Sequence, residues 1–344
     1  MSEQFKDQGG VATMDPSHLT RWLTSRLMTR ISGAAAVAAR HRKAEQARVK
    51  AAAPHRVDYF HQVDEGYSCL AAQTLERIAA RFDIELHCHL VRGQEGKNAP
   101  EPELLAQLAR ADSHEIAAGY GLSFPNHPEA PAADLVETAS QVLAAQSHSD
   151  FPKAAVSVSD ALWRDDADRL AQLAAELGTA SPEATTAAIE AGTAKRRELK
   201  HYSGAMFYYG GEWYWGVDRL YHLEARLAAL GADMQPGTPL IAPRPSEDLA
   251  GQRDTGQFTL ELYASLRSPY TAVIFDRAVA FAKAAGVTLS VRPVLPMVMR
   301  GVPATREKGM YIFTDAAREA RAADVPYGNF YDPIGDPARR CYAL

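Results

Sequence analysis

The sequence predicts an α/β fold that contains two copies of one β-α-β unit. Residues 56–91 and 259–294 each hold two short runs of alternating apolar residues, as in half-buried strands, around a segment of helical spacing. The two stretches align without a gap when Tyr67 is set against Tyr270. An internal repeat of this length predicts two similar domains. The aligned apolar positions include Val57 with Leu260, Leu70 with Val273, Ile78 with Phe281, Leu86 with Leu289 and Cys88 with Val291.

The composition of the 344-residue chain fits two globular domains. Its 47% hydrophobic content can bury two cores, and a formal net charge of −5 gives no indication of a nucleic-acid surface. The three cysteines are too scattered for a disulfide framework and form no CxxC pair, which predicts a reducing, cytoplasmic location. No run approaches the roughly 20 apolar residues of a membrane span, so we expect no integral membrane association.

Residues 1–54 are predicted to form a polar leader and a basic amphipathic helix that Pro54 ends. Such a helix can bind a membrane surface or an acidic partner. The simpler interpretation is that its apolar stripe docks on the first domain while its charges face water. A mitochondrial transit peptide fits less well, because the leader contains acidic residues.

Residues 55–232 are predicted to form the first domain. Its β-α-β unit is followed by alanine-rich amphipathic helices over about residues 101–201, by a β-hairpin at Gly210-Gly211 and by a helix that begins at Asp218. This order is the layout of a thioredoxin fold with a helical insertion. The helices predicted in the insertion are about Glu103–Tyr120, Ala132–Ala145, Lys153–Gly178 in two pieces, and Pro182–Lys200.

Residues 233–256 are predicted to be a linker, and residues 257–344 a second thioredoxin-like domain with an incomplete C-terminus. The sequence ends inside the helical insertion expected there, before a hairpin could follow. A sheet without that hairpin exposes a strand edge and one side of its core. We therefore expect either that the sequence is a truncated piece of a longer protein, or that the first domain or a second chain covers the gap.

The turn Ser268-Pro269-Tyr270-Thr271 is the strongest candidate site in the second copy. Ser268 precedes a predicted helix and Pro269 stands in its first turn, where a missing N–H costs nothing. Backbone N–H groups and the helix dipole then favour an anion, such as a thiolate, near the Ser268 hydroxyl. The alternative is that Ser268 only caps the helix, as serine often does.

The first copy has an altered site at the equivalent turn. Glu65 and Gly66 stand where the second copy has Ser268 and Pro269, and a carboxylate there would repel a thiolate. On the following strand, His87 and His89 share one face. A His-x-His pair can hold a metal, but without an evident third ligand we expect ordinary polar-face histidines and no metal site.

Several motifs resemble a known family. The run Tyr214-Trp215-Gly216-Val217-Asp218-Arg219-Leu220 resembles the Phe-Trp-Gly-x-Asp-Arg-Leu signature of the DsbA-like family that contains 2-hydroxychromene-2-carboxylate isomerase and the kappa-class glutathione transferases. The Ser268 turn is similar to the Ser-Pro-Tyr-Ser turn of those enzymes. The resemblance covers roughly residues 56–230 and again 257–344. Further matching positions are Lys308, Tyr311, Asp315 and Arg318, and Gly121-Leu122-x-Phe124-Pro125.

The resemblance implies parts of a glutathione site in each copy, and neither copy carries a complete one. Ser268 would donate to the glutathione thiolate, with Pro269 and Tyr270 beside it, and Lys308 would attract a substrate carboxylate. In the first copy, Val217 and Asp218 would hold the γ-glutamyl end. Two departures affect that copy: Glu65 replaces the serine, and Gly204-Ala205 replaces the family's Val-Pro, whose proline is cis.

We therefore expect a glutathione-dependent isomerase or transferase that acts on a small electrophilic or aromatic substrate, and family resemblance makes a homodimer plausible. The alternative is a catalytically degenerate thioredoxin-like binding protein without redox activity. Disulfide exchange is excluded by residue type, because the CxxC positions hold Ser268 and Thr271 in one copy and Glu65 and Ser68 in the other.

Overall fold

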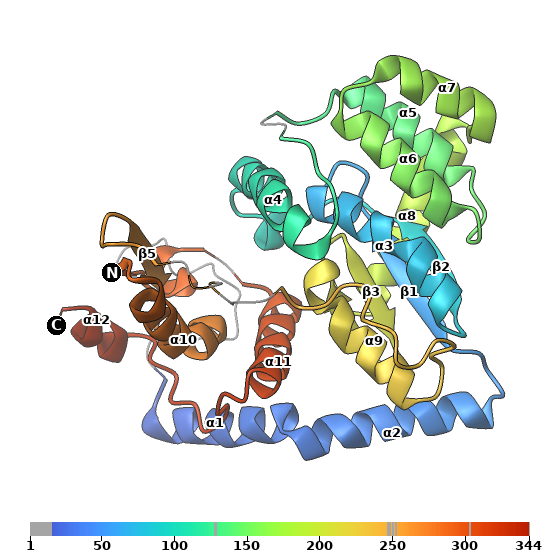
Figure 1. Ribbon diagram of the computed structural model, residues 1–344. Coiled ribbons are helices and arrows are strands. Elements are labelled where there is room, and N and C mark those ends of the chain that lie inside the picture. Colours follow the sequence, from blue (N-terminus) through green and yellow to red (C-terminus); the bar gives the residue numbers. More distant parts are fainter. Residues whose placement is uncertain are drawn as a thin grey trace. The chain divides into compact units, whose positions relative to one another are not determined.

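A computed structural model describes residues 16–126, 129–245, 249, 251, 253–302 and 304–343. The chain divides into two compact units, which we describe separately (Figure 1). The large unit is His41–Pro245, and the small unit is Met1–Arg40 together with Ser246–Leu344. Helix α2 (Ala34–Lys50) contains the boundary between them. No described helix is long and apolar enough to cross a membrane.

The large unit contains a four-stranded sheet in the order β2-β1-β3-β4. Strands β1 and β2 are parallel, with Val57 opposite Leu86, and β3 runs antiparallel to both β1 and β4. This β-α-β unit followed by a β-hairpin and a helix is the thioredoxin topology, with α4 to α8 inserted after β2. The elements are β1 (Arg56–His61), α3 (Gly66–Arg81), β2 (Glu85–Leu90), η2 (Gly96–Asn98), α4 (Pro102–Ala117), η3 (Ala118–Tyr120), α5 (Ala133–Ala144), α6 (Phe151–Trp163), α7 (Ala167–Leu177), α8 (Pro182–Glu198), β3 (Met206–Tyr209), β4 (Glu212–Trp215), η4 (Val217–Arg219) and α9 (Leu220–Ala229).

Sequence periodicity explains how this unit folds. Helix α3 places its apolar face on the sheet, and one core joins the sheet to α6 of the insertion and to α9. Tyr59 and Phe207 meet at the centre of that core, with ring centroids 4.8 Å apart. The hairpin turns at Gly210 and Gly211, whose φ values of 52° and 86° favour glycine. The predicted helices of the insertion are all present, with ends that differ by a few residues.

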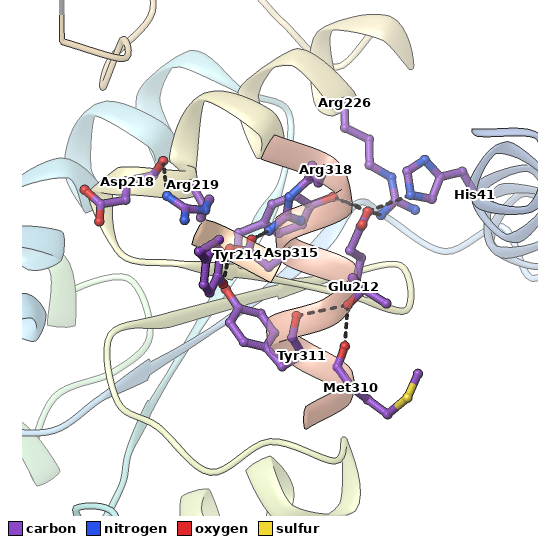
Figure 2. Close-up of polar contacts among 12 residues, drawn as sticks. His41, Glu212, Tyr214, Asp218, Arg219, Arg226, Met310, Tyr311, Asp315 and Arg318 are labelled. Carbon is purple, nitrogen blue, oxygen red and sulfur yellow. Dashed lines mark hydrogen bonds and ion pairs between the residues drawn. The ribbon is translucent and has the colours of Figure 1, made fainter. Parts of the chain in front are cut away.

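The part of α2 that belongs to the large unit is attached to the hairpin (Figure 2). His41 Nε2 lies 2.6 Å from Glu212 Oε2, and the Tyr214 hydroxyl donates to the same oxygen at 3.0 Å. Arg226 of α9 donates to the Tyr209 carbonyl oxygen at 2.9 Å. These contacts bring helix and hairpin together although they are distant in sequence.

The small unit contains a two-stranded parallel sheet, β5-β6, in which Leu260 lies opposite Leu289. The β-α-β unit predicted for the second copy is therefore present, whereas a second thioredoxin-like domain, incomplete at its C-terminus, remains a prediction. Helix α11 packs on α10. The elements are α1 (His18–Ser32), β5 (Thr259–Ala264), α10 (Pro269–Ala285), β6 (Thr288–Pro293), η5 (Met297–Arg300), α11 (Arg306–Ala322) and α12 (Asp336–Tyr342).

Helix α1 is held by the C-terminal segment of the small unit. The buried Arg21 side chain donates to the carbonyl oxygens of Asp332 and Ile334. Thr29 accepts a hydrogen bond from the backbone N–H of Asn329 at 2.7 Å. The leader residues 1–15 lie outside the described residues. Apolar side chains of α1 remain exposed, namely Leu19, Trp22, Leu23 and Leu27.

Candidate functional site

Ser268 lies immediately before α10 in the small unit. Its Oγ accepts a hydrogen bond from the backbone N–H of Thr271 at 3.3 Å, and Pro269 occupies the first helical position. Within the described residues the Ser268 hydroxyl hydrogen has no acceptor. Ser268 therefore caps the helix, and its hydroxyl can still donate to an anion at the positive end of the helix dipole.

Tyr270 connects α10 to α11. Its hydroxyl donates to Asp315 Oδ2 at 2.7 Å, and Asp315, which is 2% exposed, also pairs with Arg318. Figure 2 shows Asp315 and Arg318 on α11. The Tyr270 hydroxyl thus fixes one helix to the other, which leaves the half-buried ring as the part that can border a ligand.

Lys308 lies in the first turn of α11, after the cap Thr305. Its side chain is half-buried, and burial lowers the pKa of the ammonium group below its usual value. A partly desolvated ammonium group attracts a carboxylate more strongly than one in water does. This property fits the role expected for Lys308.

The equivalent turn of the large unit is a closed polar cluster. The Ser68 hydroxyl donates to Glu65 Oε2 at 2.7 Å, and the Glu65 residue is 8% exposed. Ser68 Oγ also accepts hydrogen bonds from the backbone N–H groups of Gln62 at 3.1 Å and Ala205 at 3.0 Å. One hydroxyl therefore joins the end of β1, the start of α3 at Gly66 and the loop before β3.

The backbone before β3 lies directly against Glu65. A Cβ atom on Gly204 would lie 2.5 Å from Glu65 Oε2, so a larger residue there would force neighbouring side chains to move. Ala205 follows with a φ of 51°, and the described residues contain no cis peptide bond. Burial raises the pKa of the Glu65 carboxyl to about 7, opposed by the Ser68 hydrogen bond and by the charge of Arg196.

Val217 and Asp218 begin the terminal helical segment of the large unit. Val217 is buried, whereas Asp218 is exposed and accepts a hydrogen bond from the Tyr120 hydroxyl at 2.9 Å. The predicted site residues are thus divided between the two units. Glu65, Gly66, Ala205, Val217 and Asp218 belong to the large unit, and Ser268, Pro269, Tyr270 and Lys308 to the small unit.

The two turns share hydrogen bonds at aligned positions. Tyr67 donates to Asp112 at 2.8 Å, as Tyr270 does to Asp315 at 2.7 Å. Ser68 accepts from the N–H of Gln62, and the aligned Thr271 accepts from that of Ser265 at 3.3 Å. Sequence reasoning missed the Tyr67–Asp112 contact, and extending the same gapless alignment beyond residue 91 would have indicated it.

The described cysteines of the large unit lie in the core, and the histidines on either side of Cys88 lie in contacts between aromatic rings. Burial raises the pKa of Cys69 to about 12, and Cys88 lies in the core as predicted. His148 joins the predicted His87 and His89 pair, with its ring centroid 4.6 Å from that of His87. Its Nδ1 accepts from the Cys88 N–H, and no group of residues in the described part of the chain could hold a metal ion.

Neither the protein-family models nor the curated proteins give a match to this chain. Among solved structures, one of 2-hydroxychromene-2-carboxylate isomerase is 20% identical and has a TM-score of 0.39, covering 51% of this chain and 96% of its own. A probable DsbA oxidoreductase from Streptomyces coelicolor is 15% identical with a TM-score of 0.38, covering 54% of this chain and 92% of its own. These values are too low to establish membership of a family.

Proposed function

We propose that the chain is a glutathione-dependent isomerase or transferase of the DsbA-like type, acting in the cytoplasm on a small electrophilic or aromatic substrate. The observation that carries this proposal is the Ser268 hydroxyl at the start of α10, which accepts from Thr271 and keeps its hydrogen for an anion. Hydrogen bonding and the helix dipole would lower the pKa of a glutathione thiol there. The resulting thiolate adds reversibly to a conjugated substrate, so that a bond can rotate or exchange.

The remaining residues have supporting roles in this proposal. Lys308 attracts a substrate carboxylate, and the Tyr270 ring and Pro269 border the thiolate. In the large unit, Val217 and Asp218 take the γ-glutamyl end of a second glutathione. No metal is required. The shared hydrogen bonds at Tyr67 and Tyr270 support a tandem repeat whose second copy is incomplete, and a homodimer is part of the same proposal.

Isothermal titration of glutathione into the full chain and into Ser268→Ala tests the proposal. We expect binding to both proteins, with the pKa of the bound thiol higher in Ser268→Ala by about one unit, because one hydrogen bond to the thiolate is lost. Ultraviolet absorbance of the thiolate across a pH series measures that pKa. Ser181→Ala is the matched control, since Ser181 caps α8 in the same way but has no proposed role.

Each result bears on a different part of the proposal. If glutathione does not bind the unmodified chain, glutathione dependence is wrong and the binding-protein alternative takes its place, an alternative that the altered residues Glu65 and Ala205 favour. If the thiol ionises equally in Ser268→Ala and in Ser181→Ala, the role of Ser268 is limited to helix capping.

A further inference from the structure

A buried arginine without a partner lies in the same corner of the large unit as Glu65. Arg196 on α8 is 4% exposed, and its Nη1 has no hydrogen-bond partner in the part of the chain that the structure describes. Leaving a guanidinium group buried and unpaired costs several kcal/mol. A ligand that supplies an acceptor to Nη1 would remove much of this cost.

Arg196 and Glu65 influence each other without contact. The charge of each acts on the other, but no hydrogen bond joins them. The Glu65 carboxyl is held in place by Ser68 and by the Gly204 backbone, so it cannot move far toward the arginine. Two opposite charges are therefore buried within electrostatic range of each other without a hydrogen bond between them, and an oxyanion there would supply the acceptor that Arg196 Nη1 lacks.

We propose that Arg196 and Glu65 form a binding site for a small singly charged oxyanion, which is taken up together with a proton. Arg196 donates to one oxygen of the anion, and the protonated Glu65 carboxyl donates to another. A doubly charged anion is disfavoured, because Asp64 and Glu95 add negative charge on either side. This site is separate from the Ser268 site, and it does not rest on glutathione binding.

A cavity lies beside α8, next to the residue that follows Arg196. It has a volume of about 440 Å³, and two arginines line its wall with two glutamates. Arg197, which follows Arg196, lines it, and so does Glu95, whose charge acts on Arg196. The lining residues are Arg92, Glu95, Glu190, Thr193, Ala194 and Arg197.

The proton that is taken up with the anion binds to the Glu65 carboxylate. Because burial raises its pKa to about 7, the carboxyl is half protonated at neutral pH, and an anion beside it favours the protonated form. Other charged and titratable groups act on the pair, and all of them except Arg197 are present in every variant considered. They are Asp64 of the turn, Tyr59 of β1, Tyr67 of α3, Glu95 of the loop after β2, and Arg197 and His201 near Arg196.

Titration of acetate into the full chain tests the proposal, with acetamide and sulfate as neutral and doubly charged contrasts. We expect acetate to bind roughly tenfold more tightly at pH 6 than at pH 8, the ratio of protonated Glu65 at the two values. Repeating the pH 8 titration in buffers of different ionisation enthalpy should reveal uptake of about one proton. Acetamide and sulfate should bind more weakly than acetate.

Three variants test whether the side chains of Arg196 and Glu65 both bind the anion. Arg196→Met should abolish acetate binding, and because it removes an unpaired buried charge it should leave the protein at least as stable. Arg197→Met, the neighbour on the cavity wall, should bind acetate as the unmodified chain does. Glu65→Gln should bind acetate equally at pH 6 and pH 8 without proton uptake, since its amide can donate at either pH.

The opposite results overturn the proposal. Acetate binding that survives in Arg196→Met places the anion elsewhere, and so does a loss of binding in Arg197→Met equal to that in Arg196→Met. A pH dependence that persists in Glu65→Gln removes the carboxyl from the site. Sulfate binding tighter than that of acetate contradicts the preference for a single charge. Absence of acetate binding to the unmodified chain rejects the site, and none of these results bears on Ser268.

Discussion

Replacing Gly192 by alanine is expected to lower the free energy of unfolding of the large unit by about 3 kcal/mol. Gly192 lies where α8 crosses β2, and a Cβ atom there would come within 2.1 Å of the Leu90 carbonyl oxygen. That oxygen belongs to the backbone of β2, so helix or strand must move to admit a methyl group. The better helix propensity of alanine, about 1 kcal/mol, offsets only part of the cost.

Gly309→Ala is the matched control for this change. Gly309 also lies within a helix, α11, but a Cβ atom there would meet nothing within 4 Å. We expect this variant to be more stable than the unmodified chain by roughly 0.5–1 kcal/mol. Urea unfolding followed by tryptophan fluorescence measures both, since Trp163, Trp213 and Trp215 lie in the large unit and Trp22 lies in the small unit. Equal stability of the two variants would contradict the close approach of α8 to β2.

The crossing at Gly192 also determines where Arg196 lies. The two residues are four positions apart on α8, so they share a helix face, and both are buried. Close approach of the helix to the end of β2 brings the guanidinium group into the corner that holds Glu65. A methyl group at position 192 should therefore weaken acetate binding as well as folding, which links packing to the proposed anion site.

Sequence periodicity predicted most elements of the large unit and much less of its site. Alternating and helical spacing identified both β-α-β units, and Gly210-Gly211 identified the hairpin, because each signal depends on neighbouring residues. The proximity of Arg196 to Glu65 depends on a helix far along the chain, and periodicity does not say which element a helix face meets. A buried arginine also contradicts the usual expectation for a charged side chain, so the basic run at Lys195 to Arg197 gave no signal.

In the small unit, too, the sequence predicted local elements but not the contacts between distant segments. The strand and helix around the Ser268 turn were predicted, but the attachment of α1 to residues 329–334 was not, because it rests on hydrogen bonds between backbone groups and the side chains of Arg21 and Thr29. The predicted single N-terminal helix is interrupted at Gly33, whose ψ of 146° ends α1. Glycine has a weak helix propensity, which explains the break.

Glu65→Gln is expected to raise the free energy of unfolding by about 3 kcal/mol at pH 8 and to leave it nearly unchanged below pH 5. The folded-state pKa of Glu65, about 7, lies above its usual value of 4.5. Between these values the folded protein holds a proton that the unfolded chain releases, so stability falls as pH rises through this window. Glutamine stays neutral and accepts the Ser68 hydrogen bond at every pH.

Buried histidines make the free energy of unfolding rise with pH, which is opposite to the effect of Glu65. Only the difference between variants therefore isolates the contribution of Glu65. Burial lowers the pKa of His61 and of His201 to about 3, and their neutral forms add stability as pH rises toward the usual value of 6.5. Urea unfolding of the unmodified chain, Glu65→Gln and Glu76→Gln should therefore be compared from pH 5 to pH 8 in buffers free of carboxylates.

Glu76 lies exposed on the same helix as Glu65, which makes Glu76→Gln the control for a lost surface charge. We expect the free energy of unfolding of Glu76→Gln to change with pH as that of the unmodified chain does. The free energy of unfolding of Glu65→Gln should rise above both as the pH increases above 5. A constant offset between Glu65→Gln and the unmodified chain would mean that the carboxyl ionises alike in the folded and unfolded states. The turn before α3 would then lack the proton that the anion site requires.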